Sequence, residues 1–549
     1  MKVYQRLAHA FKAEGVSAVF GIMGDANMYW MHELNEVGVK LLEVRHEGAG
    51  LGMADGWARV THTPAVATAT CGPGVSQLAT ALVTASRASS PVVVFAGQHP
   101  LNDPEYNQHF DNEKFAAACE AGFVGLTSPD NTDEAVRKAF YMARVESRPV
   151  MLSVPMDVQQ KAFDDDEPYQ PSTALLTRQA VQPDASGLER AADIVASSKK
   201  PVIIVGRGAM WSGAGEAVLK LAKRIGALVC TTLQAKTWLS QDEFHVGISG
   251  FYGTKTAMQL FEEADCVIAL GASMNRYTIE HGYLYPNAKY IQMDVKAHNI
   301  MGNGKAADCY LQSDARAGAE ALEAALAKRS FQQKGFRTPD VKERLAGHFA
   351  DKTKFELEPG TVDPREVILA LDKIVPEHVS LCTGSGATTG FSNMLFTRRR
   401  PFVMCGHYFG CIGQMMPAAI GACVGTGNKP VLLVDGDASM MMHLAEFETA
   451  VRYEMPILMV CLNNEALGSE YYKLDVHGMK KELSAIPTPD LGSVGRAFGG
   501  KGRIARTMDD LRAAAEEWVA NPCPMIIDAR ISRSVVTLPY RRVHYGKDE

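Results

Sequence analysis

The sequence predicts an α/β protein made of three doubly wound domains, each with a parallel sheet at its centre. The chain has 549 residues, which is enough for roughly three domains of common size. Short apolar runs typical of buried strands alternate with amphipathic helix patterns. Polar stretches that contain proline interrupt this alternation twice and divide the chain into three blocks.

These interruptions set the expected domain boundaries. The first domain spans 1–165 and ends in the acidic linker FDDDEP, the central domain spans 180–330, and the third spans 360–530. Residues 531–549 show no clear periodicity, so we expect a C-terminal tail there.

Composition excludes several classes of function. The net charge of −6 and the pI near 6.2 indicate no basic surface for nucleic acid. The eleven cysteines include no CxxC pair and lie mostly in apolar surroundings, which favours reduced thiols in a cytoplasmic protein. The N-terminal stretch MKVYQRLAHAFKAEG lacks the apolar region of a signal peptide, and no apolar run reaches membrane-spanning length. We therefore expect a small-molecule partner rather than nucleic acid or a membrane.

In the first domain, a carboxylate follows a strand pattern. The run LLEV leads into Arg45, His46 and Glu47, and the small residues of GAGLGMADGWAR then start a helix. A glutamate at a strand tip can approach a partner without steric obstruction. Its burial requires a partner such as a protonated heteroaromatic nitrogen. The alternative is a glutamate that only stabilises the helix N-terminus through the helix dipole.

Two further segments of the first domain end at polar residues. Gly72 and Pro73 lie in the turn TCGPGVSQ, and the strand PVVVFAGQ ends at Gln98. His99 and His109 are close in sequence to that strand end, and each is either part of a site or a surface histidine.

The third domain contains a loop suited to phosphate. A strand pattern, HVSLC, precedes the small residues of TGSGATT. Backbone N–H groups and hydroxyls in such a loop can bind a phosphate group. The candidate residues are Gly384, Ser385, Gly386 and Thr388.

An acidic turn and an asparagine pair mark the most informative stretch of the chain. The buried strand pattern PVLLV ends in Asp435-Gly436-Asp437, and the next one, PILMVCL, ends in Asn463-Asn464. Two parallel strands joined by a crossover helix place both carboxyl ends at one edge of the sheet, where α/β proteins bind ligands. Asp437 and Asn464 would meet there as hard oxygen ligands, which suit Mg²⁺ and its phosphate partners.

This stretch resembles the cofactor-binding motif of thiamine-diphosphate (ThDP) enzymes, in which GDG is followed by NN about two dozen residues later. Ala438 replaces the third glycine of the motif, a change small enough for the backbone still to approach a diphosphate. The resemblance implies that Mg²⁺ is held by Asp437, Asn464 and the carbonyl of Ala466. It also implies cofactor contacts from Gly436, Ala438, Ser439 and Leu467.

The same resemblance assigns roles to the other segments. Glu47 would protonate N1′ of the aminopyrimidine, and Gly72 and Pro73 would border that ring. The segment HYFGCIGQMMP resembles the loop that seats the bend of the cofactor. The carbonyl of Gly410 would face the 4′-amino group, and Ile412 would lie between the two rings.

The central domain resembles that of the acetolactate synthase branch in three segments: VGRG, ADCVIALGASMNR and KYIQMDV. FAD-binding members usually carry an arginine and an acidic pair after the third strand. This chain has Ser273-Met274-Asn275-Arg276 instead, so FAD is not expected. A purely structural central domain is the leading interpretation, and an ADP or CoA moiety is the alternative.

The resemblance covers nearly the whole chain and identifies it as similar to acetolactate synthase and related 2-oxo-acid decarboxylases and lyases. It implies a pyrimidine-binding first domain, a Rossmann-like central domain and a diphosphate-binding third domain. In this family the glutamate of one subunit reaches the cofactor held by the other. We therefore expect a homodimer or homotetramer that acts on a 2-oxo acid by decarboxylation, carboligation or both.

Three interpretations of the activity stay open. The first is an enzyme that decarboxylates or ligates 2-oxo acids. Glu470 lies six residues after Asn464. Simple decarboxylases carry a glutamate at this spacing that helps to protonate the reaction intermediate, whereas carboligating synthases usually carry an apolar residue. A 2-hydroxyacyl-CoA lyase similar to the oxalyl-CoA decarboxylase branch is the second interpretation, in which the basic tail RRVHYGK would close over a CoA ester. A non-catalytic ThDP-binding protein is the third.

We expect Glu470 to lie in a partly apolar pocket with Met415 and Met416 and to serve there as a proton donor, together with Glu47 and Gln98 as catalytic residues. The competing interpretation is an outward-facing helix on which Glu470 pairs with Lys473.

Overall fold

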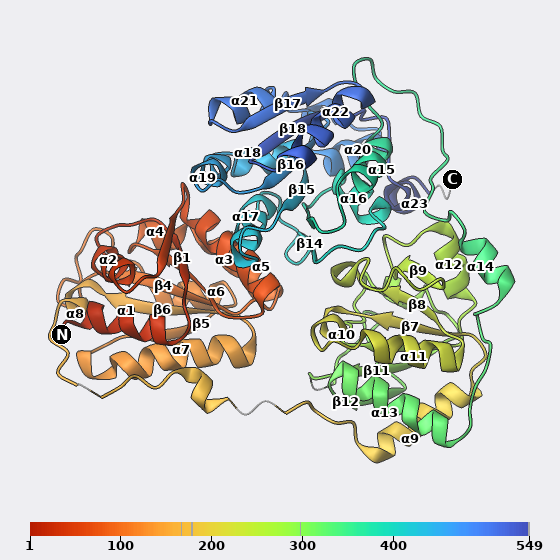
Figure 1. Cartoon of the computed structure of the whole chain (residues 1–549), viewed down its shortest axis with the longest axis horizontal. Coiled ribbons are helices and arrows are strands. Elements are labelled where there is room, and N and C mark those ends of the chain that lie inside the picture. Colours follow the sequence, from red (N-terminus) through yellow and green to blue (C-terminus); the bar gives the residue numbers. More distant parts are fainter. Residues whose placement is uncertain (166, 177–178, 297, 547–549) are drawn as a thin grey trace.

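The computed structural model describes residues 1–165, 167–176, 179–296 and 298–546. It contains three six-stranded sheets whose strand pairs are all parallel, one in each predicted domain (Figure 1). This confirms the predicted fold class. In the described part of the chain, every helix falls short of the length and apolarity needed to cross a bilayer.

The first domain has the strand order β2-β1-β3-β4-β6-β5. Its strands are β1 (Ala18–Gly21), β2 (Lys40–Glu43), β3 (Ala65–Ala69), β4 (Val92–Gln98), β5 (Gly122–Gly125) and β6 (Pro149–Pro155). Its helices are α1 (Val3–Ala13), α2 (Met28–Glu36), α3 (Glu47–Thr61), α4 (Pro73–Ser76), α5 (Ala79–Arg87), α6 (Asn112–Ala118), α7 (Thr132–Glu146) and α8 (Met156–Gln159).

The third domain has the order β14-β13-β15-β16-β18-β17, the same topology as the first. Its strands are β13 (Ser380–Thr383), β14 (Val403–Cys405), β15 (Val431–Gly436), β16 (Ile457–Asn463), β17 (Lys501–Ala505) and β18 (Met525–Arg530). Its helices are α15 (Pro364–Ile374), α16 (Thr389–Leu395), α17 (Met415–Gly425), α18 (Asp437–Met442), α19 (Glu446–Arg452), α20 (Gly468–Val476), α21 (Leu491–Ala497) and α22 (Met508–Ala520).

The central domain has a different order, β12-β11-β10-β7-β8-β9, which is typical of dinucleotide-binding folds. Its strands are β7 (Pro201–Val205), β8 (Leu228–Thr231), β9 (His245–Ile248), β10 (Cys266–Leu270), β11 (Lys289–Asp294) and β12 (Cys309–Gln312). Its helices are α9 (Ala185–Ser197), α10 (Arg207–Trp211), α11 (Gly215–Ile225), α12 (Lys255–Glu262), α13 (Ala315–Lys328) and α14 (Pro339–Leu345).

The loops after β7 and β10 touch at the point where this strand order reverses. The N–H of Gly206 donates to the carbonyl of Leu270 at 3.0 Å, and the N–H of Gly208 donates to that of Gly271 at 3.0 Å. A Cβ atom on Gly206 would lie 2.2 Å from the Gly271 oxygen. Ligands of such folds bind in this crevice, so the backbone contact narrows the space for one. The absence of FAD stays a prediction, which the visible absorption of the purified protein would test.

Both faces of the first sheet are buried. Phe20 belongs to one core cluster and its neighbour Val19 to another, because successive strand residues point to opposite faces. Burial on both faces explains why strands such as PVVVF are apolar throughout. The cluster that contains Phe20 continues into the third domain through Met416 and Ile420.

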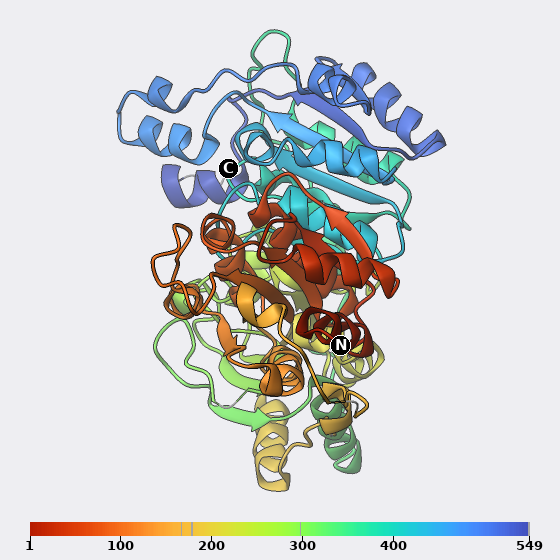
Figure 2. The ribbon, with the colours of Figure 1, turned by 90° about the vertical axis from the view of Figure 1, so that its left-hand side faces the viewer.

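Helices α3 and α17 join the first and third domains, which lie one above the other in Figure 2. A Cβ on Gly56 would lie 1.9 Å from the carbonyl oxygen of Ala418, and one on Gly421 would lie 1.8 Å from that of Met53. Since no other residue permits such a close approach of two backbones, these glycines set the distance between the helices.

Two of the expected boundaries differ from the observed packing. Phe336, Val341 and Leu345 add to the core of the central domain, beyond the predicted end at residue 330. Within the expected tail, Leu538–Tyr545 form helix α23. Its residue Tyr540 packs against Tyr472 of α20, so this segment belongs to the third domain's surface. Long-range packing rather than local periodicity holds both segments.

A lysine is buried where the central and third domains meet. Lys236 is 5% exposed, and its Nζ donates to the carbonyl of Phe396. Burial lowers the pKa of Lys236 to about 8, because the charged form loses its hydration.

We predict that Lys236→Met raises Tm at pH 7 and that this gain shrinks as the pH rises from 8 to 10. Between the lowered folded pKa and the ordinary value of 10.5, the unfolded chain binds more protons than the folded one, so the wild type gains stability with pH. Thermal denaturation at three pH values measures the effect. A gain that is independent of pH would contradict it, and Lys223→Met, at an exposed lysine, is the control.

Candidate active site

The ends of β15 and β16 bring the acidic turn and the asparagine pair together. Gly436 pairs with Leu462 in the parallel register, so Asp437 and Asn464 follow neighbouring strands at one edge of the sheet. Both side chains are buried, at 2% and 4% exposure. The predicted juxtaposition of these two residues is therefore present.

Asp437 is a buried carboxylate whose ionised form needs support. One of its oxygens, Oδ2, accepts a hydrogen bond from the hydroxyl of Thr488 at 2.8 Å, and the backbone N–H of Asn464 also favours its charged form. Burial outweighs these contacts and raises the pKa of Asp437 to about 6. A divalent cation would stabilise such a carboxylate.

The turn after Asn464 presents oxygen atoms toward the same edge. The side-chain oxygen of Asn464 accepts the N–H of Ala466 at 3.2 Å and keeps a second lone pair. Glu465 has φ +52°, a left-handed conformation that reverses the chain. Ala466 then bridges to Ala485, and the N–H of Leu467 donates to the carbonyl of Ser484 at 2.8 Å, which anchors the turn.

The small-residue loop after β13 lies against the acidic turn. A Cβ on Gly384 would overlap the carboxylate of Asp435, at 1.7 Å from Oδ1. A Cβ on Gly436 would lie 2.9 Å from the hydroxyl oxygen of Thr388. Gly386 has φ +104° with open space around it. Together with the buried Ser385, these residues leave backbone groups accessible in the way that a diphosphate requires.

Ser439 ties a second loop to this edge. Its hydroxyl donates to Oδ2 of Asp435 at 2.6 Å and accepts the N–H of Gly413 at 2.8 Å. Asp435 is fully buried, and burial raises its pKa to about 7. Through this bond, the loop that contains Gly410 and Ile412 is held beside α18, where Ala438 is half-buried.

The donor set fits Mg²⁺ and a diphosphate better than a metal bound by protein alone. No group of three or more His, Cys, Asp or Glu side chains that could hold a metal occurs among residues 1–165, 167–176, 179–296 and 298–546. One carboxylate, one amide oxygen and one backbone carbonyl leave half of an octahedral shell to phosphate oxygens and water. The residues present therefore fit the group that the sequence predicted.

The first domain supplies a separate half-site. Glu47 is the first residue of α3 and is half-buried. Its Oε1 would lie 3.4 Å from a Cβ on Gly74, so the carboxylate is next to the turn that contains Gly72 and Pro73. In the described part of the chain, no hydrogen bond or ion pair joins Glu47 to the third-domain residues above.

Comparison with known proteins agrees with this geometry in all three domains. Family models of the thiamine pyrophosphate enzymes match the N-terminal TPP binding domain over residues 1–121, the central domain over 188–322 and the C-terminal TPP binding domain over 384–529. The chain belongs to the thiamine pyrophosphate enzyme family. Thiamine pyrophosphate is the same compound as ThDP, so the predicted family is confirmed.

Curated relatives align along almost the full chain. A probable acetolactate synthase large subunit from Methanocaldococcus jannaschii is 29% identical and covers 96% of this chain and 91% of its own. A sulfoacetaldehyde acetyltransferase from Castellaniella defragrans is 29% identical, with 92% and 88% covered. The acetolactate synthase isozyme 2 large subunit of Escherichia coli strain K12 is 28% identical, with 96% and 95% covered. The similarity to acetolactate synthases matches the predicted branch of the ThDP family.

Gln98 ends β4 in this ThDP enzyme, as predicted, but its side chain already has a partner. Its Oε1 accepts the hydroxyl of Ser153 at 2.7 Å. His99 and His109 are in edge-to-face contact, with ring centroids 4.3 Å apart. Burial and the neighbouring ring lower the pKa of His99. A catalytic role for Gln98 stays a prediction.

The expected setting of Glu470 is wrong. Its side chain is 55% exposed on α20, and its Oε1 lies 3.9 Å from Nζ of Lys473. Met415 and Met416 are instead buried in the core at the contact between the first and third domains. The first turn of α20 points Glu470 outward, as in the competing interpretation.

The arginines of the tail are engaged inside the chain. Arg541 donates to the Asp351 carboxylate at 2.6 Å, and Arg542 donates to the carbonyl of Phe251 at 2.9 Å. Their binding to CoA phosphates would require these contacts to break. Lys547 lies outside the described residues.

Sequence reasoning missed several residues that shape the site. Thr488 and Arg530 reach it from segments without a motif, and Glu446 comes from the crossover helix between the two parts of the ThDP motif. Arg530 binds Glu465 at 2.7 Å and the carbonyl of Pro489 at 3.0 Å, so it holds two loops beside Asp437. The only signal in the sequence was the position of Arg530 at the end of the apolar run MIIDA.

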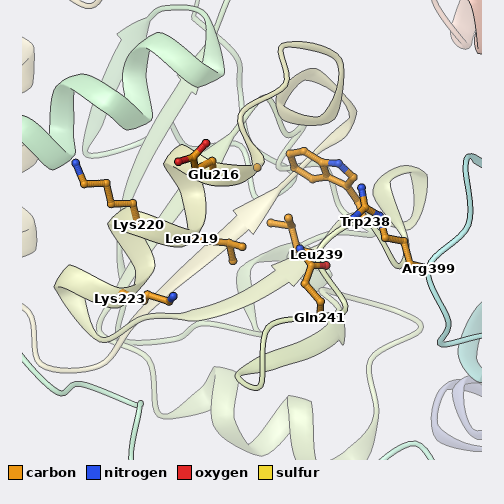
Figure 3. Close-up of a pocket in the computed structure, with 9 residues that line it drawn as sticks. Glu216, Leu219, Lys220, Lys223, Trp238, Leu239, Gln241 and Arg399 are labelled. Carbon is orange, nitrogen blue, oxygen red and sulfur yellow. The ribbon is translucent and has the colours of Figure 1, made fainter.

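A cavity of about 540 Å³ lies elsewhere, between α11 and residues 238–241 of the central domain, with Arg399 at its rim (Figure 3). Its walls include Lys220, Lys223 and Trp238. None of the predicted cofactor residues lines it, so it is distinct from the candidate active site.

Proposed function

We propose that the protein is a ThDP- and Mg²⁺-dependent enzyme that cleaves or forms a carbon–carbon bond next to the carbonyl of a 2-oxo acid. The main support for the proposal is that Asp437 and Asn464 lie together at neighbouring strand ends, beside the small-residue loop from Gly384 to Thr388. The names of the relatives, acetolactate synthase and sulfoacetaldehyde acetyltransferase, support chemistry on small carbonyl compounds.

In this proposal each half-site has a separate task. Asp437, Asn464 and the carbonyl of Ala466 hold Mg²⁺, and the 384–388 loop binds the diphosphate. Gly410 offers a carbonyl to the aminopyrimidine, and its φ of +80° turns the loop there. Glu47 holds a proton at N1′ of that ring. The bound cofactor supplies the electron sink that makes bond cleavage next to a carbonyl possible.

We further propose that a second copy of the chain completes the site. Apolar side chains stay exposed near the strand ends of both half-sites, among them Met441 at 44% and Met442 at 58% in α18 and Met23 at 45% after β1. Exposed apolar surface of this kind marks association surfaces. A homodimer in which Glu47 meets the partner's third domain would cover it, and two such dimers would form a homotetramer.

Turnover assays with ThDP and Mg²⁺ test the proposed function. Pyruvate, sulfoacetaldehyde and a 2-hydroxyacyl-CoA form the substrate panel, and chelation of Mg²⁺ is the control. We expect consumption of a 2-oxo acid that depends on both ThDP and Mg²⁺. Turnover of the CoA ester alone would favour the lyase alternative. ThDP binding without any turnover would favour the non-catalytic one.

We predict that Glu470→Gln retains ThDP affinity and lowers turnover of a 2-oxo acid by about tenfold, which is less than the roughly 10²–10⁴-fold of a full general acid–base step because the side chain is exposed. The expectation rests on its position six residues after Asn464, in the first turn of α20, which begins close to the strand edge. The measurement is kcat from pH 5 to 9, with Lys473→Gln as the control for loss of the ion pair. Equal kcat in Glu470→Gln and wild type at every pH would remove Glu470 from the mechanism.

A further inference from the structure

Glu446 is a buried carboxylate of the third domain that contacts the first. It is 1% exposed and begins α19. Its Oε1 accepts the backbone N–H of Arg45 at 2.9 Å and that of His46 at 3.0 Å, and its Oε2 accepts the hydroxyl of Thr449 at 2.7 Å. The two N–H groups directly precede Glu47 in the chain.

This contact binds the start of the helix that presents Glu47. The N–H groups at a helix start have no partner within the helix. His46 satisfies one of them with its own ring, whose Nδ1 accepts the N–H of Gly48 at 3.0 Å. Glu446 accepts the N–H groups of Arg45 and His46, which come just before the helix. Its negative charge also complements the positive end of the α3 dipole. The third domain of the same chain therefore orients the backbone at Glu47.

Other contacts at this end of α3 are weaker. Arg45 forms an ion pair with Glu448 at 2.8 Å, but the arginine is 53% exposed, and exposed pairs contribute little. The rings of His46 and His443 meet edge to face at 5.3 Å. Glu446 is thus the buried polar anchor between α3 and the segment that follows α18.

We propose that Glu446 is a positioning residue that holds Glu47 in the orientation needed to act on the cofactor. This inference rests on the proposed function of Glu47. The segment from Asp437 through α18 to Glu446 then connects the metal site of one chain with the glutamate that serves its partner's site. Loss of the anchor frees the start of α3, and a displacement of about 1 Å in a catalytic group can cost roughly 10²-fold in rate.

The decisive measurement is hydrogen–deuterium exchange at C2 of bound ThDP, which reports the action of Glu47 before any substrate is added. Glu446→Ala should bind ThDP like the wild type but exchange about 10- to 100-fold more slowly, with kcat reduced and KM unchanged. Glu446→Gln keeps an oxygen that accepts both N–H groups, so it should exchange near the wild-type rate. Glu448→Ala, which removes the ion pairs with Arg45 and Arg452 but neither backbone contact of Glu446, is the matched control.

Wild-type exchange in a folded Glu446→Ala protein would overturn the inference, provided that Glu47→Gln exchanges slowly. Wild-type exchange in Glu47→Gln would instead overturn the proposed function. If Glu446→Ala fails to fold, Glu446→Asp tests the inference in its place. The aspartate side chain is one methylene too short for the contact, so we expect slow exchange at C2 in Glu446→Asp and fast exchange in Glu446→Gln. Equal rates in those two variants and the wild type would also overturn the inference.

Discussion

Replacement of Asp437 by alanine is expected to abolish Mg²⁺-dependent binding of ThDP. Asp437 is the carboxylate at the strand edge that lies beside Asn464 and within reach of the 384–388 loop. Without it, the cation would lose its charged protein ligand, and the hydroxyl of Thr488 would lose its acceptor. Interactions with a charged group contribute about 1.5–3 kcal/mol, and every 1.4 kcal/mol is a factor of ten, so loss of this one ligand should lower the affinity by roughly 10- to 100-fold.

Isothermal titration of the variant with ThDP, with and without Mg²⁺, measures this loss. Asp437→Asn keeps the size of the side chain and an acceptor for Thr488, so it separates loss of charge from loss of structure. Asp475→Ala, which removes an aspartate of α20 that pairs with Lys481, should bind normally. Unchanged affinity in Asp437→Ala would exclude Asp437 as a ligand of the metal.

Replacement of Glu47 by glutamine should leave ThDP bound while most turnover is lost. The amide keeps the shape of the side chain but cannot hold and release a proton at N1′. General acid–base steps contribute about 10²–10⁴-fold, and we expect a loss in that range. Because Glu47 is only half-buried and has no hydrogen-bonded partner in the described chain, the folded structure should tolerate the change.

Three measurements on Glu47→Gln belong together: ThDP affinity, kcat with the accepted substrate, and exchange at C2. Glu36→Gln, at the exposed end of α2, is the control. A variant with normal exchange at C2 would show that Glu47 does not activate the cofactor. Loss of ThDP binding would point to a binding role instead.

The pairing of Asp437 with Asn464 was predictable because it depends on local rules. Two apolar runs predict buried strands, the helix between them predicts a parallel crossover, and parallel strands end at one edge of the sheet. The position of the 384–388 loop was predictable by the same reasoning, because this loop follows a parallel strand and therefore lies at the same edge of the sheet. Glu47 was placed beside the turn at Gly72 for an equivalent reason in the first domain.

The setting of Glu470 was not predictable in this way. Its distance along the chain from Asn464 limits how far it can lie from the site, but the rotation of α20 decides whether it points inward. That rotation follows from the burial of Tyr472, whose hydroxyl donates to the carbonyl of Val535, and from the bond between Ser469 and Tyr540 of α23. A segment interpreted as a tail therefore determines which face of α20 is exposed.

The sequence by itself determined the three parallel sheets, the family and the residues at the strand ends. Apolar periodicity and motif spacing act over a few residues or one crossover, and such local constraints survive in any arrangement of the domains. Only the tertiary structure decided that Thr488 supports Asp437 and that Glu446 anchors the helix of Glu47. Those contacts join segments that are 51 and 400 residues apart in the sequence. The contact of Thr488 forms because Arg530 holds two loops in place. The contact of Glu446 forms because Gly56 and Gly421 let helices α3 and α17 pack backbone to backbone.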